Sequence, residues 1–381
     1  MRLSVPVSAF VAAVVGFGGT LALIIAAAGA LGATRTETAS WVTAICLAMA
    51  VESLWLSWRT RMPVITAWST PGAALVAASS GFTMAEGVGA FIVTGLLLAA
   101  TGMFSPLTRL IARIPASVAS GMLAGILAGF AINAVKTVPA DPLFILPLIA
   151  AFFVIRLFNP ALSVLAVLIG GAAAAVLTDR VGALPAPELS TLTLIAPDFS
   201  LAAMIGLTVP LHLVTMASQN LSGLAVLKAA GYEPPAGPLI AVTGLFSILS
   251  APFGALTTNL AAISAAICTG PDAHPDPGER WKTGPFYALA YLVFAIFGAS
   301  LVALFAVLPQ GLIVLVAGLA LMAPLANAFA IALKEESERM AATVTFATTA
   351  SGLTLFGIGG AFWGLIAGIV VLALDSSKKA M

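Results

Sequence analysis

The feature that most constrains this chain is a close succession of apolar runs, each about as long as a bilayer is thick. A membrane-spanning helix needs about 20 mainly apolar residues. The first run is too long for a signal-peptide core and further runs follow it, so we interpret it as a span. Twelve uninterrupted runs lie at residues 7–31, 41–58, 84–104, 116–135, 142–157, 160–178, 201–227, 237–250, 284–305, 309–331, 340–356 and 359–374. The pattern predicts an all-α polytopic membrane protein.

The composition agrees with a lipid environment. Hydrophobic residues make up 61% of the 381 residues and charged residues only 8%, whereas soluble domains carry about 25% charged residues. This balance excludes a soluble enzyme, and a net charge of +1 leaves no basic field for a nucleic acid. Cys46 and Cys268 lie in apolar runs, so we expect two buried hydrophobic residues rather than a disulfide or metal pair.

Two further apolar stretches, 62–80 and 251–269, are broken. Pro71 interrupts the first, and Pro252 and Gly254 open the second. Each stretch starts with a few Pro-, Thr- or Ser-rich residues and continues as an Ala-rich half-helix. Non-helical backbone at membrane depth is tolerated only where it is buried in protein or lines a wet cavity. The two broken segments therefore predict the place of a central site.

The two broken segments also indicate an internal repeat. The window 67–78 matches the window 255–266 at six of twelve positions, which aligns Ala67 with Ala255. Each window is the third segment of a seven-segment half. Because seven is odd, the second half must enter the membrane from the opposite side. We therefore predict a 7+7 inverted repeat, with residues 1–180 as the first half and 198–381 as the second.

The basic residues set the expected orientation. Fourteen crossings place both termini on one side of the membrane. With the termini in the cytoplasm, thirteen of the 16 Lys and Arg residues lie inside, and only Arg35, Lys136 and Arg180 lie outside. This bias follows the positive-inside rule and predicts cytoplasmic termini.

The half-helices offer a site for an anion. Ser69 or Thr70 is a suitable cap before Pro71, and Thr258 or Asn259 is expected in that role in the second half. Two half-helix N-termini would then face each other near the midplane, each with unpaired N–H groups and about half a positive charge. Such a pair needs no Arg or Lys to hold an anion. The alternative interpretation is two ordinary Pro-kinked helices.

Four windows carry a family resemblance. In these windows, and over its whole length, the chain resembles the benzoate/proton symporter family (BenE). The windows lie at 65–75, 214–227, 251–263 and 266–277. The resemblance implies secondary active uptake of benzoate or a similar aromatic acid. That family is similar in turn to nucleobase transporters, which implies a mobile core domain of segments 1–4 and 8–11 and a gate domain of segments 5–7 and 12–14.

The resemblance also implies a substrate site between core and gate. Carried over by position, the candidates come from segments 1, 3, 8 and 10. They are Phe17, Gly18, Gly19, Trp68, Ser69, Thr70, Pro71, Thr215, Ser218, Gln219, Thr257, Thr258 and Asn259. The nucleobase relatives have carboxylates in segments 8 and 10, where this chain has Ser218 and Thr258. A carboxylate would repel an anion, so the departure fits an acid substrate.

Two ionisable residues lie well inside predicted spans, where such residues are functional candidates. Glu52 in segment 2 could carry the coupled proton, or it could make a structural bond, for example with Arg59. His212 in segment 8 could shuttle a proton, and the alternative is a neutral histidine that packs between helices. The sequence leaves open which of them acts.

Several uncharged residues have two interpretations. Gln219 and Asn259 are donors that could orient a carboxylate, or they could join helices. Trp68 and Phe17 could clasp an aromatic ring, although packing is the common fate of membrane aromatics. Asn327, near the end of a gate-domain span, is expected to be structural.

Two runs of glycine at every fourth position lie in the predicted gate domain. Such spacing allows close approach of helices. We expect tight packing of a rigid scaffold, with a homodimer contact as the alternative. The runs are Gly121, Gly125 and Gly129, and Gly360, Gly364 and Gly368.

Together these features predict an inner-membrane secondary transporter that imports benzoate or a similar aromatic carboxylate with a proton, by alternating access. The carboxylate would rest on the half-helix N-termini at Pro71 and Asn259. No cofactor or metal is expected beyond H+ as the coupling ion, and no enzymatic activity, since no nucleophile–base pair or phosphate-binding loop is recognisable. The alternatives are a same-fold transporter of nucleobases or inorganic anions, and an anion channel.

Overall fold

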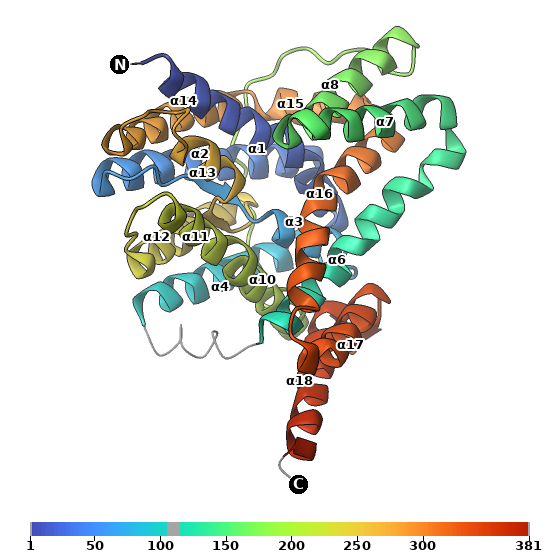
Figure 1. The fold of residues 1–381 in the computed structure, drawn as a ribbon. Helices are drawn as coiled ribbons and strands as arrows, with labels where there is room; N and C mark the ends of the chain where they lie inside the picture. The colour runs from blue at the N-terminus through green and yellow to red at the C-terminus, as the bar shows by residue number, and fades with distance from the viewer. Residues whose placement is uncertain (1, 105–114, 380–381) are drawn as a thin grey trace.

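The computed structural model describes residues 2–104 and 115–379, which are mostly helical (Figure 1). Arg109 and Arg113, two of the basic residues assigned to the inner side, lie outside the described residues. The elements of the first half are α1 (Ser4–Ala30), α2 (Arg35–Thr60), β1 (Thr66–Trp68), α3 (Thr70–Ala77), α4 (Met84–Met103), α6 (Ala116–Lys136), η1 (Val138–Ala140), α7 (Pro142–Phe158) and α8 (Pro160–Leu177).

The second half follows an extended connection and opens with one long helix. Two π-helical stretches interrupt this helix. That helix comprises α9 (Leu201–Ala203), the π-helical η2 (Met204–Thr208), α10 (Val209–Val214), the π-helical η3 (Thr215–Asn220) and α11 (Leu221–Ala229). Then come α12 (Ala236–Ser250), η4 (Ala251–Phe253), β2 (Thr258–Leu260), α13 (Ile263–Thr269), η5 (Pro277–Lys282), α14 (Thr283–Ile296), α15 (Gly298–Val307), α16 (Gln310–Ala332), η6 (Glu336–Glu338), α17 (Arg339–Ala350), β3 (Thr354–Leu355), β4 (Ile358–Gly359) and α18 (Gly360–Lys379).

The predicted segments all have a counterpart in the described part of the chain, but they differ in length and straightness. Within residues 2–104 and 115–379, seven helices are long and apolar enough to cross a bilayer alone. The predicted straight span 284–305 is wrong, because the chain bends by 62° between α14 and α15. Ser190 stabilises the bend, since its hydroxyl accepts a hydrogen bond from Ala299 N at 2.8 Å.

The two broken segments are confirmed and meet in the middle of the fold. Strands β1 and β2 pair antiparallel, with Ala67 opposite Asn259 at the centre. The pairing satisfies backbone groups that would be costly to leave unpaired at membrane depth. Because the equivalent strands of the two halves run in opposite directions, the second half is inverted relative to the first.

The second half-helix begins later than expected. The prediction that Thr258 or Asn259 caps it is wrong, because both residues belong to β2. Helix α13 begins at Ile263, and its N-cap, Ala262, makes no side-chain cap. Ala67 thus faces Asn259 in the pairing, whereas the sequence match had aligned Ala67 with Ala255. The sequence match rested mostly on alanine identities, and alanine is abundant in this chain, so such identities arise easily by chance.

The helices pack in two groups. In the first group, α4 lies on α12, α2 lies on α14, and α1 contacts α3 and α13. In the second group, α6 packs against α16 and α17, α17 packs on α18, and α7 packs on α8. Figure 1 shows α6 and α16 running side by side, with α17 and α18 at one end. The groups touch where α1 meets α16 and α8, and where α3 meets α6.

Glycines bring helices into backbone contact within both groups. A Cβ on Gly244 of α12 would lie 2.3 Å from Ala99 N of α4, so only glycine fits there. In the predicted glycine runs, Cβ atoms on Gly121 and Gly364 would lie 2.6 Å from Ala342 O and 2.8 Å from Thr345 O. Helix α17 is thus held between α6 and α18, which agrees with the packing interpretation of these glycines.

Candidate functional site

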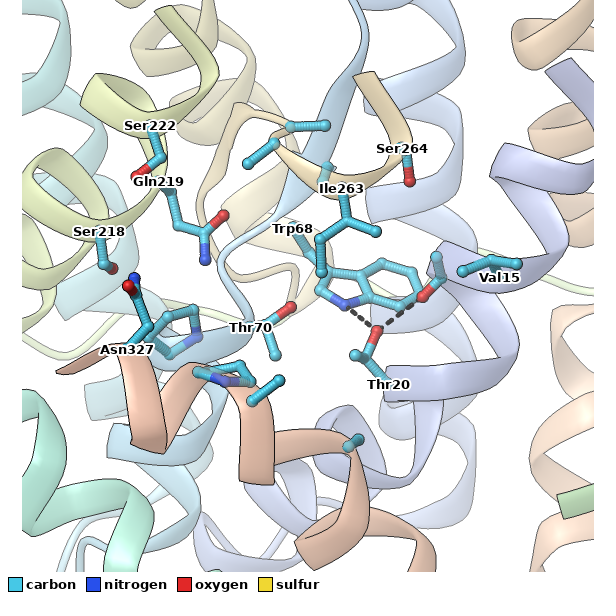
Figure 2. Close-up of a pocket in the computed structure, with 18 of the residues that line it drawn as sticks. Val15, Thr20, Trp68, Thr70, Ser218, Gln219, Ser222, Ile263, Ser264 and Asn327 are labelled. Carbon is cyan, nitrogen blue, oxygen red and sulfur yellow. Dashed lines mark hydrogen bonds between the residues drawn. The ribbon is translucent and has the colours of Figure 1, made fainter. Parts of the chain in front are cut away.

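A cavity of about 400 Å³ lies where the β1–β2 crossing faces α16 (Figure 2). Its volume falls within the roughly 300–1,000 Å³ typical of small-molecule sites. The first group of helices contributes residues of α1, α2, β1, α3, η3, α11, α13 and α14. The second group contributes Leu123 of α6 and four residues of α16: Ala320, Ala323, Pro324 and Asn327. The cavity therefore lies between the two groups, and none of the described residues that line it is charged.

The N-terminus of α3 opens onto this cavity. Ser69 has an extended backbone and caps the helix, because its hydroxyl accepts a hydrogen bond from Gly72 N at 3.1 Å. Pro71 fits the first turn, where the missing N–H costs nothing. Thr70 and Pro71 both line the cavity. The positive end of the α3 dipole and the Thr70 hydroxyl therefore face the same space.

The start of α13 lies across the cavity. Ala262, Ile263 and Ser264 line it. The Ser264 hydroxyl donates to Ala12 O of α1 at 3.1 Å, so its proton is already engaged. Gly16 allows this approach of α1, because a Cβ at that position would lie 2.9 Å from Ser264 Oγ.

A π-helical turn presents polar side chains on the third wall. Such turns are frequent at functional sites because they displace the side chains that follow. Ser218 and Gln219 lie in η3 and line the cavity, as does Ser222 one turn later. Figure 2 shows Gln219 extending from this helix toward Thr70. Asn259 Nδ2 donates to Gln219 Oε1 at 3.5 Å and to Leu260 O at 2.9 Å.

Aromatic rings form the fourth wall. Trp68 of β1 lines the cavity, and its Nε1 donates to Thr20 Oγ1 at 2.9 Å (Figure 2). Tyr291 of α14 also lines the cavity, with its ring centroid 6.4 Å from that of Trp68. Phe17 packs edge-on against Trp68 at 5.6 Å. The wall suits a flat apolar ring, since such rings favour edge and tilted contacts.

The structure places the thirteen predicted contact residues in two sets. Trp68, Thr70, Pro71, Ser218 and Gln219 line the cavity. The others lie outside the cavity lining: Phe17, Gly18, Gly19, Ser69, Thr215, Thr257, Thr258 and Asn259.

The residues of the second set hold the walls together. Thr215 Oγ1 donates to Ser69 Oγ at 2.9 Å and lies 3.4 Å from Thr257 Oγ1, which joins segments 3, 8 and 10. Gly18 and Gly19 face α8 instead, and a Cβ on Gly18 would lie 2.7 Å from Leu165 Cδ1.

Several polar or aromatic residues line the cavity although sequence reasoning did not select them as contacts, among them Thr20, Ser222, Ser264, Tyr291 and Asn327. Ser264 was missed because the second half-helix had been placed too early. Asn327 was expected to be structural, but it follows Ala320 and Ala323 on one face of α16. A polar residue on a stripe of small residues was the signal that could have revealed it.

Glu52 lies in a separate, fully buried cluster. Thr258 Oγ1 donates to Glu52 Oε1 at 2.6 Å and also lies 3.0 Å from the Thr243 carbonyl oxygen. Thr258 N donates to Ser247 Oγ at 2.9 Å. Glu52 Oε2 has no partner among the described residues. Among the described residues, Glu52 forms no ion pair with Arg59, and its hydrogen bond is to Thr258 instead.

His212 lies elsewhere. It is buried on α10, which packs against α4, and it does not line the cavity. Its Nε2 lies 3.5 Å from Thr101 Oγ1, and its Nδ1 has no partner in the described part of the chain. The two candidate proton carriers therefore differ in their bonds: Glu52 is hydrogen-bonded to a residue of a broken segment, whereas the polar contact of His212 is to Thr101 of α4.

These features define a class of protein. Two inverted halves, each with a broken third segment, enclose a cavity between two groups of spans, as in a membrane transporter, and the described residues that line it carry no charge. Sequence comparison specifies the family: the chain belongs to the BenE family, described as benzoate membrane transport protein, which residues 1–374 match.

Individual relatives match over their full length. The chain is 42% identical over 389 residues to "Inner membrane protein YdcO" of Escherichia coli K12, covering 100% of both. It is 34% identical over 380 residues to the "Benzoate membrane transport protein" of Acinetobacter baylyi, covering 99% of this chain and 96% of that protein.

Solved structures share the fold. The transmembrane domain of the cyanobacterial bicarbonate transporter BicA superposes with a TM-score of 0.59 at 15% identity, over 97% of this chain and 98% of that chain. SLC26A9 superposes with a TM-score of 0.67 at 12% identity, over 98% of this chain and 65% of that chain. The chain therefore has the predicted all-α fold of fourteen membrane segments in a 7+7 inverted repeat.

Proposed function

We propose that this transporter imports benzoate or a similar aromatic carboxylate together with a proton, by alternating access across the inner membrane, and leaves its substrate chemically unchanged. Both termini would lie in the cytoplasm. The observation that carries the proposal is the central cavity, which combines an aromatic wall with uncharged donors. A relative that is 34% identical is named a benzoate membrane transport protein.

The cavity supports a definite pose. The substrate carboxylate would lie at the N-terminus of α3, within reach of the Thr70 hydroxyl and the Gln219 amide. The ring would lie against Trp68 and Tyr291. Uncharged donors suit a transporter, since a full cation in this small cavity would hold an anion too tightly to release it.

The proton is assigned to Glu52 on the basis of its contact with Thr258. A buried carboxylate without a cation is costly in its charged form, so the group has a reason to take up a proton. The single hydroxyl proton of Thr258 can go either to Glu52 Oε1 or to the Thr243 carbonyl. Protonation of Glu52 would turn that hydroxyl toward Thr243. Strand β2 would thus respond to the state of Glu52.

Alternating access would come from movement between the two helix groups. We propose the group around α1–α4 and α10–α14 as the core and the group of α6–α8 and α16–α18 as the gate. Both groups line the cavity, so their relative movement would open it to one side or the other. A smaller cavity of about 70 Å³ shares Ser218, Ser222 and Asn327 with the main one and extends along α6 and α16.

The test is uptake of labelled benzoate into proteoliposomes with and without an inward proton gradient. Accumulation that requires the gradient and collapses with a protonophore is expected. Symport of one anion with one proton is electroneutral, so a membrane potential alone should drive no accumulation. Flux that ignores the gradient and shows single-channel currents would indicate an anion channel instead.

A second candidate is a transporter of the same fold for an inorganic anion or a neutral ring. It is favoured by the absence of charge among the described residues of the cavity, because such a lining does not strongly prefer an anion over a neutral molecule. Competition distinguishes the candidates. Benzoate should displace labelled benzoate, whereas bicarbonate, sulfate and uracil should not. Displacement by bicarbonate, sulfate or uracil, but not by benzoate, would favour the second candidate.

A further inference from the structure

Two amides, Asn259 and Gln219, connect strand β2 to the cavity. Asn259 is fully buried at the centre of the β1–β2 crossing, and Gln219 is half-buried in the cavity wall. A primary amide has two different ends, since its nitrogen only donates and its oxygen only accepts hydrogen bonds. The orientation of the Gln219 amide therefore decides whether the cavity meets a donor or an acceptor.

A backbone carbonyl fixes the orientation of Asn259. The Leu260 oxygen can only accept, and Asn259 Nδ2 donates to it at 2.9 Å. A flipped Asn259 would bring two oxygens together. The cost of the observed orientation is visible, because Asn259 Oδ1 is buried without a partner among the described residues. Buried acceptors are rarely left unpaired. An unpaired Oδ1 at this position therefore indicates that the useful end of the Asn259 amide is its donor, Nδ2.

Asn259 Nδ2 also donates to Gln219 Oε1, over a long 3.5 Å, and so favours one orientation of the Gln219 amide. That orientation leaves Gln219 Nε2 for the cavity. Figure 2 shows this nitrogen directed toward the space between Thr70 and Asn327. The chain of bonds therefore runs from the Leu260 carbonyl through Asn259 to Gln219, and it ends in a donor.

We propose that Asn259 is a positioning residue that keeps the Gln219 amide with its nitrogen toward the cavity, and that this pair sets the preference for a carboxylate over a neutral amide. The inference rests on the proposed function, because it assigns selectivity within the same cavity. With Gln219 reversed, the cavity would present an oxygen that repels a carboxylate and accepts a bond from an amide N–H.

The experiment measures inhibition constants of benzoate and benzamide on purified protein, in competition with labelled benzoate. Benzoate and benzamide have nearly the same size and the same ring. Benzoate carries a negative charge and only accepts hydrogen bonds, whereas benzamide is neutral and can also donate them. Gln219→Leu should weaken benzoate binding by ~10- to 100-fold, the usual worth of a hydrogen bond to a charged group. Asn259→Ser lets Gln219 turn, so the ratio of benzamide to benzoate inhibition constants should fall by roughly tenfold.

A double-mutant cycle separates positioning from structure. In the Gln219→Leu background, Asn259→Ser should leave the ratio unchanged, because no amide remains to be oriented. The matched control is Asn220→Ser. Asn220 is also a fully buried amide that holds Leu260, accepting from its N–H at 3.0 Å, but its Nδ2 donates to Met216 Sδ and not to the Gln219 amide. Its loss should lower stability and affect both probes equally.

Three results would overturn the inference: an unchanged ratio in Asn259→Ser, a shift that persists without Gln219, or the same shift in Asn220→Ser. If Asn259→Ser does not fold, Asn259→Ala also removes Nδ2 without adding a charge and should lower the ratio likewise. Wild-type protein that binds no benzoate would overturn the proposed function as well, whereas benzoate binding with an unchanged ratio overturns the role of Asn259 alone.

Discussion

The two broken segments share a backbone design and differ in how well their polar groups are paired. In the first half, α3 is capped by Ser69, and Pro71 fits its first turn. In the second half, α13 has no side-chain cap, and the neighbouring groups Asn259 Oδ1 and Glu52 Oε2 have no partners among the described residues. A fully paired network is rigid, whereas a partly paired one can change partners. The first segment is therefore suited to hold a substrate, and the second to respond to a proton.

Strand β2 connects the proposed proton carrier with the cavity wall. Thr258 and Asn259 are consecutive, so their side chains point to opposite faces of the strand. Thr258 contacts Glu52 and Asn259 contacts Gln219. A change in the hydrogen bonds of Glu52 would thus alter Thr258, the neighbour of Asn259, which orients Gln219. The comparison predicts that changes near β2 affect coupling and that changes near α3 affect affinity.

The largest expected effect follows from Glu52→Gln. The amide keeps the shape of the side chain and cannot carry a proton, so gradient-driven accumulation should be lost. One proton per substrate supports roughly tenfold accumulation for each pH unit, and this factor should fall to about one. Exchange of labelled for unlabelled benzoate should continue, because it needs no net proton movement. Both are measured in proteoliposomes.

His212→Gln is the matched control, since it also removes a buried titratable group from a membrane helix. His212 contacts neither β2 nor the cavity, so accumulation should be kept. Accumulation that survives Glu52→Gln and is lost in His212→Gln would reverse the assignment and remove the functional distinction between the two broken segments.

A smaller effect is expected from Thr70→Val. The Thr70 hydroxyl lines the cavity and has no hydrogen-bond partner among the described residues, so it can donate to a carboxylate. Valine keeps the shape and removes the donor, which should weaken benzoate binding by ~10-fold. Accumulation at saturating benzoate should be retained. Isothermal titration and uptake measure the two quantities.

Ser264→Ala provides the equivalent change at α13. Its hydroxyl donates to Ala12 O, so it offers the substrate only lone pairs. Its loss should change benzoate affinity by less than about twofold. Equal losses in the two variants would show that both half-helices bind the carboxylate alike, contrary to the comparison.

The sequence predicted the parts of this site that depend on backbone chemistry. Proline, glycine and hydroxyl residues at membrane depth indicated both broken segments, and Trp68 and Thr70 stand beside the first break. Gln219 was selected through the family resemblance, because it lies in segment 8 and not beside a break. Partners across the fold were not predictable. Glu52 and Thr258 are 206 residues apart, and nothing local in either window indicates the bond between them.

Register caused the other errors. Alanines dominate the identities between the two windows, and the alignment that they favour placed Asn259 at the start of α13. The antiparallel pairing places it at the centre of the crossing, opposite Ala67. Asn327 escaped selection for a related reason. Its role depends on which face of α16 meets the first helix group, and a hydrophobic helix shows little periodicity when it is buried on several sides.

The last prediction concerns Trp68→Phe. Phenylalanine keeps an aromatic surface against the substrate ring and removes the bond from Trp68 Nε1 to Thr20 Oγ1. A neutral hydrogen bond contributes about 1 kcal/mol, and this bond acts on benzoate only by holding the ring in place, so affinity should fall by at most ~5-fold. Trp68 belongs to the first broken segment, so the number of protons moved per benzoate should not change. A pH electrode and labelled substrate measure this ratio in the same vesicles. If Trp68→Phe uncoupled the proton while leaving affinity intact, the coupling function would extend to β1, and the division between the two segments would have to be abandoned.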